Sequence, residues 1–122
     1  YEIVFADLVR GNYQSDSDLL FTVSNDAWFG DSIGPLQHMQ IARMRALELQ
    51  RPLVRVTNNG VSAVYDPISH TQQTMPQFEA ATMKADIKLI QGDSVYSQYG
   101  NVFVWGFVLL MMIGGIGVRF RK

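Results

Sequence analysis

Cysteine is absent from this chain of 122 residues, so the sequence contains neither a disulfide framework nor thiol chemistry of its own. Histidine occurs only twice, and His38 and His70 do not have the spacing of metal ligands, so we expect no metal site. Strong charge is also missing, because the formal net charge is −1 and three of the ten cations stand in the last four residues. The rest of the chain is mildly acidic, which argues against a nucleic-acid-binding surface.

Charged residues are missing altogether from residues 102–118, a run of 17 residues that is closed by Arg119, Arg121 and Lys122. A helix of this length spans about 25 Å, close to the hydrocarbon thickness of a bilayer. We therefore expect a transmembrane helix at residues 102–119, followed by a cytoplasmic basic tail at 120–122. The positive-inside rule then places everything before Val102 on the outer face of the membrane. A buried core helix is the alternative.

The remaining part of the chain is mixed in polarity and suits one domain or part of one. Its apolar periodicity predicts helices over residues 2–12 and 35–50, with a buried strand at 19–24 and further strands at 53–57, 61–65, 71–75 and 81–89. Residues 25–34 read as a loop, and 91–101 as a tether. Because the pattern opens on a helix and continues into a meander of strands, it predicts a layered α/β domain over 1–90 whose first strands lie upstream.

Four clusters could carry chemistry: Tyr1 with Glu2, residues 24–30, residues 37–48 and residues 55–60. Each alone also fits a structural role. Glu2 is favoured in a first helical turn by the helix dipole, and Asn25 and Asp26 are ordinary loop formers. Trp28 and Phe29 suit a core or a lipid-facing anchor. His38 near a helix start reads as a surface or capping residue, and Arg43, Arg45, Arg51 and Arg55 could form an ion-pair network with Glu48.

Taken together, the clusters resemble a known family. Three parts of the sequence carry this resemblance: Tyr1-Glu2, the run SNDAWFGDSIGPLQHMQIARMRALELQRPLVRVTNNGVSAVYDP, and Tyr96 with Gly100-Asn101 ahead of the apolar segment. They resemble the carbon–nitrogen hydrolase (nitrilase) superfamily. More narrowly, they resemble its bacterial apolipoprotein N-acyltransferase branch. The resemblance implies the C-terminal part of a nitrilase-like αββα sandwich domain, followed by one transmembrane helix, in the bacterial inner membrane with the domain on the periplasmic face.

The resemblance also implies where the site lies. In this family a strand–turn–helix elbow carries Cys-Tyr-Glu with the Cys as nucleophile, so we expect the nucleophile directly before Tyr1, and a general-base Glu and a Lys further upstream. The backbone N–H of Tyr1 would be an oxyanion donor, and Glu2 would orient the Lys or assist proton transfer. Asn25, Asp26, Trp28 and Phe29 would form a substrate-contacting loop.

The implied reaction transfers a fatty acyl chain from a membrane phospholipid to the N-terminal amine of a diacylglyceryl-cysteine lipoprotein, through a Cys thioester and with no cofactor. The expected partners are the phospholipid donor, the apolipoprotein acceptor, the membrane and the upstream part of the same polypeptide, but no nucleic acid. Two alternatives stay open: a membrane-anchored amidase of the same superfamily, and a catalytically dead, membrane-tethered binding module.

Overall fold

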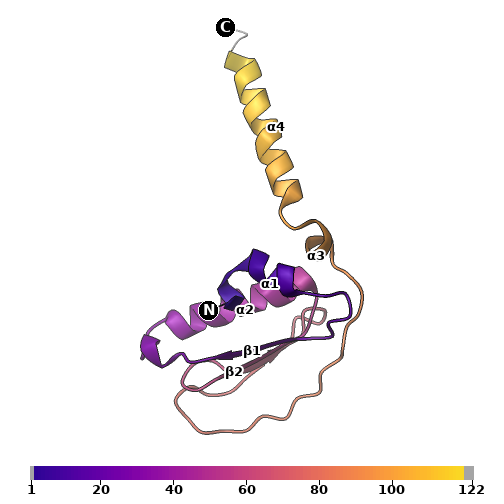
Figure 1. The fold of residues 1–122 in the computed structure, drawn as a ribbon. Helices are drawn as coiled ribbons and strands as arrows, with labels where there is room; N and C mark the ends of the chain where they lie inside the picture. The colour runs from indigo at the N-terminus through magenta and orange to yellow at the C-terminus, as the bar shows by residue number, and fades with distance from the viewer. Residues whose placement is uncertain (1, 120–122) are drawn as a thin grey trace.

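The computed structural model describes residues 2–119, with side chains from Glu2 to Gly115, and has a mixed α/β architecture (Figure 1). Its elements in chain order are η1 (Glu2–Val4), α1 (Ala6–Asn12), β1 (Leu20–Ser24), η2 (Ala27–Phe29), α2 (Gly34–Leu49), β2 (Leu53–Thr57), β3 (Ala63–Tyr65), β4 (Gln72–Thr74), α3 (Val95–Tyr99) and α4 (Val102–Arg119). The α/β class predicted from the sequence is confirmed.

A four-stranded sheet in the order β1-β2-β3-β4 supports the helices. β1 pairs with β2 in parallel, and α2 supplies the crossover that a parallel pair requires. β2, β3 and β4 are antiparallel neighbours, which is the predicted meander. Helices α1 and α2 lie over one face of the sheet (Figure 1).

The second face of the sheet is apolar, and its side formed by β1 is open. Phe21 and Val23 on β1 pair with Val54 and Val56 on β2, so all four side chains share this face. Phe21, Val23 and Val56 are 64%, 70% and 44% exposed. The strand expected to be buried at 19–24 is therefore only half-buried, because α2 covers one face of β1 and the side chains on its other face are exposed.

Helix α2 follows its sequence signals closely. Pro35 stands in its first turn, where a missing N–H costs nothing, and Gln50 ends it in a left-handed conformation with φ of 53°. Met39, Ala42 and Ala46 face the sheet at helical spacing and share a buried core with Leu53 and Tyr65. The helix also contacts η1, α1 and α3, so it packs against other helical elements as well as against the sheet.

The N-terminal segment departs from the single helix predicted for residues 2–12. Phe5 has extended backbone angles and separates the short 3₁₀ turn η1 from α1. Its N–H donates to the carbonyl of Glu2 at 3.0 Å, an i to i−3 bond that tightens the turn. Ile3 is thereby turned into the core, where it packs with Met39.

The strand predicted at residues 81–89 is absent, because no strand occurs between Thr74 and Val95 among the described residues. Every second side chain in this segment is still half-buried, namely Met83, Ala85 and Ile87. Ile87 lines a hollow together with Val64 of β3, and the segment runs below the sheet in Figure 1. The alternation therefore arises from packing against the sheet rather than from hydrogen bonding to its edge.

The predicted tether at 91–101 contains the short helix α3 and is tied to the domain. The buried guanidinium of Arg51 donates to the Gly92 carbonyl and to the Tyr13 hydroxyl. Ser94 Oγ donates to the Glu48 carbonyl at 2.6 Å and also accepts from the Ser97 N–H, which caps α3.

Helix α4 occupies the predicted bounds of 102–119 and projects away from the domain (Figure 1). All its described side chains, from Val102 to Gly115, are exposed. Within the part of the chain that the structure describes, none of the helices combines the length and the apolarity that crossing a membrane demands. The helix is therefore confirmed and its membrane-spanning character is not, while the basic tail at 120–122 lies outside the described residues.

Candidate functional site

Polar side chains converge where the parallel strands β1 and β2 end, the edge at which α/β sheets commonly place their functional groups. Ser24 ends β1 and Asp26 follows it, Arg55 comes from β2, and His38 comes from the second turn of α2. Because Thr22 pairs with Arg55, the side chain of Arg55 shares the face of the sheet that α2 covers.

Asp26 is the centre of this cluster and is only 1% exposed. Its Oδ2 accepts from Arg55 Nη2 at 2.8 Å, and its Oδ1 lies 3.0 Å from His38 Nδ1. Ser24 Oγ donates to the same Oδ1 at 2.7 Å. Arg55 and His38 are themselves buried, at 1% and 6% exposure, so the three charged or titratable side chains form one interior network.

The charges in this network decide its protonation. Burial alone would raise the pKa of Asp26, but the Ser24 hydroxyl, the Arg55 charge and the His38 hydrogen bond together bring the pKa below its ordinary value. Burial and then the positive charge of Arg55 lower the pKa of His38, against the opposite pull of Asp26. At neutral pH the network therefore consists of a carboxylate, a guanidinium and a neutral imidazole.

The neutral imidazole has a defined tautomer. An ionised carboxylate can only accept, so the proton lies on Nδ1 and is donated to Asp26. The edge of the Phe29 ring lies against the same imidazole, with the centroids 6.2 Å apart. The ring of His38 is thus held from two sides.

Two loops are joined beside the network. The Asp26 N–H donates to Asn58 Oδ1 at 3.1 Å, and Asn58 Nδ2 donates to Asn25 Oδ1 at 2.7 Å. Gly60 closes this junction, because a Cβ at its position would collide with the Asp26 carboxylate. Asn25 and Asp26, expected as substrate contacts, are therefore both engaged in internal hydrogen bonds.

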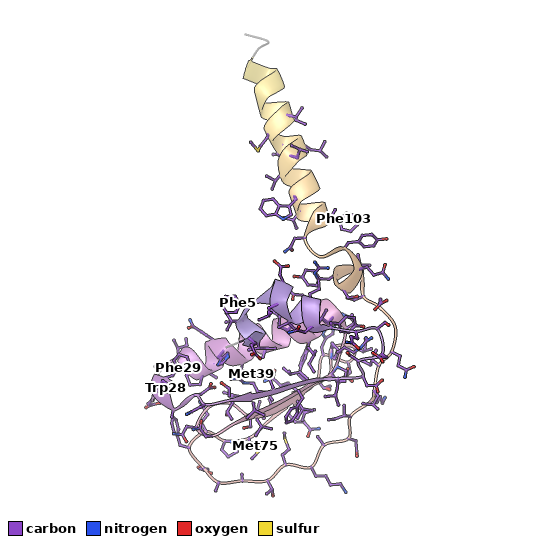
Figure 2. The ribbon with its side chains drawn as sticks, in the orientation of Figure 1. Phe5, Trp28, Phe29, Met39, Met75 and Phe103 are labelled. Atoms are coloured by element: carbon purple, nitrogen blue, oxygen red, sulfur yellow. The ribbon has the colours of Figure 1, made fainter. Side chains whose placement is uncertain are left out.

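The two aromatic residues of this loop lie differently. Trp28 is 79% exposed on η2, whereas Phe29 packs onto Gly34 as well as onto His38. Both lie at the start of α2, at the opposite end of that helix from α3 and α4 (Figure 2). The predicted loop at 25–34 contains the short 3₁₀ turn η2, and Trp28 is its outward-facing residue.

Glu2 faces the same region from η1. It is exposed, and it lines a cavity of about 120 Å³ together with Ile3, His38 and the end of β1 from Phe21 to Ser24. Tyr1, the other residue predicted to support catalysis, lies outside the described residues. Among residues 2–119, no group of three His, Cys, Asp or Glu side chains is arranged to hold a metal ion.

The buried network is what the sequence interpretation missed. His38 was expected at the surface or in a cap, yet it is buried. Its burial could have been predicted from its place four and eight residues before Ala42 and Ala46 on the apolar stripe of α2.

The arginines do not form one network with Glu48. Arg45 pairs with Glu48 at 2.8 Å, Arg43 lies 5.0 Å from the centre of the Tyr65 ring, Arg51 binds carbonyls, and Arg55 binds Asp26.

Comparison with known proteins gives a consistent family. The chain is 53% identical over 107 residues to an apolipoprotein N-acyltransferase of Vibrio vulnificus, covering 86% of this chain and 21% of that protein. It is 50% identical to the Vibrio cholerae apolipoprotein N-acyltransferase, covering 98% of this chain and 23% of that protein, and 42% identical to that of Pasteurella multocida, covering 100% and 24%. The chain thus spans about a fifth to a quarter of the length of these relatives.

The family model for carbon-nitrogen hydrolase matches residues 1–95, which include the sheet, α2 and every residue of the buried network. A match over this share of the sequence, on an α/β fold, assigns the chain. It belongs to the carbon-nitrogen hydrolase family.

Proposed function

We propose that the protein to which this chain contributes is a lipoprotein N-acyltransferase. It moves a fatty acyl chain from a membrane phospholipid to the N-terminal amine of a diacylglyceryl-cysteine lipoprotein. The observation that carries the proposal is the similarity, at 42–53% identity over 86–100% of this chain, to relatives named apolipoprotein N-acyltransferase.

The first step of the proposed reaction forms a thioester. The thiolate of a Cys directly before Tyr1 attacks the carbonyl carbon of the phospholipid ester, and the bond from that carbon to the glycerol oxygen breaks. The leaving oxygen takes up a proton, delivered by the upstream general-base Glu, and departs as lysophospholipid. The backbone N–H of Tyr1 and the upstream Lys stabilise the oxyanion.

The second step releases the acyl chain. The free amine of the lipoprotein attacks the thioester carbonyl carbon, loses a proton to the general base, and forms an amide as the carbon–sulfur bond breaks. The thiolate is regenerated, so the cycle needs no cofactor. Glu2 orients the Lys or assists proton transfer, a role that its place at the rim of the cavity beside His38 supports.

The loop that carries Trp28 is the proposed substrate contact. An indole that is 79% exposed presents a large apolar surface to an acyl chain, and Phe29 anchors the loop beneath it. Asn25 holds the loop through Asn58, and we propose that Asp26 acts in the same supporting way, because its carboxylate is buried.

Two features of the sheet support the finer fold assignment, an αββα sandwich completed by the upstream part of the polypeptide. β1 is an edge strand in the order β1-β2-β3-β4, and its free edge borders a hollow of about 260 Å³ that could receive another strand. The open apolar face formed by Phe21, Val23 and Val56 would pack against a second sheet.

The proposed organisation keeps residues 1–90 as the catalytic-domain part, 91–101 as a tether, 102–119 as a membrane helix and 120–122 as a cytoplasmic tail. The exposed apolar surface of α4 from Val102 to Ile113 supports contact with lipid or with other apolar helices. In this organisation the domain lies on the periplasmic side of the bacterial inner membrane, where both substrates present their headgroups.

A two-step assay of the full-length protein in detergent micelles tests the proposal. The protein is incubated with a phospholipid whose acyl chain is labelled, and the labelled thioester is detected by its sensitivity to hydroxylamine. A diacylglyceryl-cysteine peptide is then added, and we expect the label to move to its amine. A variant with Ser in place of the nucleophilic Cys is the control.

The alternatives predict other results. Release of labelled free fatty acid or cleavage of an amide, without transfer to the peptide, would identify a hydrolase of the same family. Phospholipid or peptide binding without any covalent label would identify a binding module. Either result would overturn the acyltransferase proposal.

A further inference from the structure

The buried trio of Asp26, His38 and Arg55 has no part in the reaction described above, yet it occupies the interior next to the proposed elbow. Taking a carboxylate, a guanidinium and an imidazole out of water is costly, and an apolar side chain of similar volume often stabilises such a position equally well. The need to fill the interior therefore does not explain why residue 38 is a histidine.

The geometry fixes this imidazole in one orientation. Asp26 binds its Nδ1 at 3.0 Å and is itself held by Arg55 at 2.8 Å and by Ser24 at 2.7 Å. The edge of Phe29 borders the same ring. A side chain held by this many contacts keeps one rotamer and one tautomer, which is what a supporting residue of a reactive site requires.

The position of the ring links the trio to the elbow. His38 and Glu2 line the same cavity of about 120 Å³. Their chain neighbours Met39 and Ile3 belong to one buried core cluster, and α2 contacts η1. A change in the imidazole therefore alters the wall against which Glu2 stands.

We propose that His38, fixed by Asp26 and Arg55, is a positioning residue for the elbow that carries Glu2. The proposal rests on the proposed function, in which the nucleophile precedes Tyr1. His38 touches neither substrate nor nucleophile in this role; it fixes the placement of η1 relative to β1. Misplacement of reacting groups by about 1 Å can reduce a rate about a hundredfold.

The test uses the full-length protein in detergent micelles and follows the single-turnover rate of thioester formation from labelled phosphatidylethanolamine. We expect His38→Leu to lower the limiting rate about tenfold to a hundredfold, with the half-saturating lipid concentration within about twofold of the wild-type value. His38→Asn places an amide nitrogen where Nδ1 lies, so it should retain a rate within about threefold of wild type and well above that of His38→Gln.

Leu49→Val is the matched control, because Leu49 is buried at the far end of the same helix and does not contact the trio. It should lower thermal stability and leave the rate unchanged. A wild-type limiting rate in His38→Leu would overturn the proposal. The proposal would also fail if Leu49→Val lost rate in the same proportion to its loss of stability as His38→Leu does. If His38→Leu does not fold, equal rates in His38→Asn and His38→Gln would overturn it.

A second readout separates this inference from the proposed function. The alkylation rate of the Cys before Tyr1 by iodoacetamide is measured against pH, without any lipid. We expect its pH profile to shift in His38→Leu and not in Leu49→Val. Absence of thioester in the wild type would contradict the proposed acyl transfer alone, whereas an unchanged alkylation profile in His38→Leu would contradict the positioning role.

Discussion

At the scale of single residues, Asp26 explains most of the site's construction. Its carboxylate joins β1, β2 and α2 through Ser24, Arg55 and His38, and its backbone N–H joins the loop after β2 through Asn58. Removing one partner of a buried ion pair leaves the other charge without compensation, which typically costs about 3–5 kcal/mol. A single side chain thus connects the strand ends to the helix start.

The buried histidine predicts a specific loss of stability in acid. Its pKa in the folded protein lies below the ordinary 6.5, so as pH falls below that value the unfolded chain takes up a proton that the folded protein does not. The free energy of unfolding should therefore fall as pH falls from about 6.5, and this part of the slope should be missing in His38→Gln. Asp26 adds a second loss at lower pH, because its folded pKa lies below 3.8.

The measurement is thermal or urea unfolding of the full-length protein at a series of pH values from about 7 to about 3, because the His38 loss begins below about 6.5 and the Asp26 loss below about 3.8. Ionic strength is kept constant throughout. If the free energy of unfolding falls with pH at the same slope in wild type and His38→Gln, the fold does not hold the imidazole neutral.

Glu2 gives a prediction that separates catalysis from stability. Its side chain is exposed, so Glu2→Gln should change the free energy of unfolding by no more than about 1 kcal/mol, the size of a helix-dipole effect. If its charge orients the Lys or moves a proton, the same change should lower acyl transfer by about two to four orders of magnitude. Glu79→Gln, another exposed carboxylate, is the control. Near-normal rates of thioester and amide formation in folded Glu2→Gln would assign Glu2 a structural role.

Motif resemblance marks Glu2, Trp28 and Phe29 directly, and their roles at the site stay predictions. His38 and Arg55 were not assigned to the site, because their partner Asp26 lies 12 and 29 positions away in the sequence. Only the sheet register and the crossover helix bring these three together.

At the scale of elements, the connection after β2 is the most constrained. Gly60 leaves no room for a side chain, since a Cβ would meet the Asp26 carboxylate. Gly60→Ala should therefore displace Asp26 from Arg55 and destabilise the protein by about 1–3 kcal/mol, the usual cost of overpacking.

Gly11→Ala is the matched substitution. Gly11 stands in α1 with open space around its Cβ position, so alanine there should be neutral or should stabilise by up to about 1 kcal/mol. Thermal unfolding of the two full-length variants decides the matter. A Gly60→Ala protein as stable as Gly11→Ala would show that the connection between β2 and β3 accommodates an alanine without loss of stability.

The 3₁₀ turn η2 predicts a change in activity without a change in fold. Trp28 is exposed, so Trp28→Ala should alter the free energy of unfolding by less than about 0.5 kcal/mol. If the indole binds the acyl chain, turnover should fall about tenfold or more, by the loss of an apolar contact area of this size. Ile68→Ala, at a residue 60% exposed on another loop, is the control. Wild-type turnover in Trp28→Ala would mean that the indole is only structural.

The helices and strands show where local patterns suffice. Helix α2 and strand β2 occur where the sequence predicts them, because Pro35 and Pro52 delimit the helix and apolar periodicity continues through it. The prediction of a strand at 81–89 is wrong because alternation indicates only that one side of a segment is buried. Packing across the face of a sheet produces this pattern as well as strand pairing does. The break at Phe5 depends on tertiary packing of Ile3, which no local pattern shows.

At the scale of the whole molecule, the proposed function makes the chain one part of a larger site. It carries the sheet β1 to β4, the crossover helix and the residues beside the elbow, and it spans about a fifth to a quarter of its relatives. The open apolar face and the free edge of β1 are the surfaces on which the upstream part would pack. The proposed nucleophile, general base and Lys all belong to that part.

The most direct test of this account is to locate the acyl adduct. Full-length protein is incubated with a phospholipid of one defined acyl chain, digested at a pH that preserves thioesters, and analysed by tandem mass spectrometry. We expect a single hydroxylamine-labile acyl group on a Cys bonded directly to the nitrogen of Tyr1. An acyl group on any other residue, or a residue other than Cys before Tyr1, would contradict it.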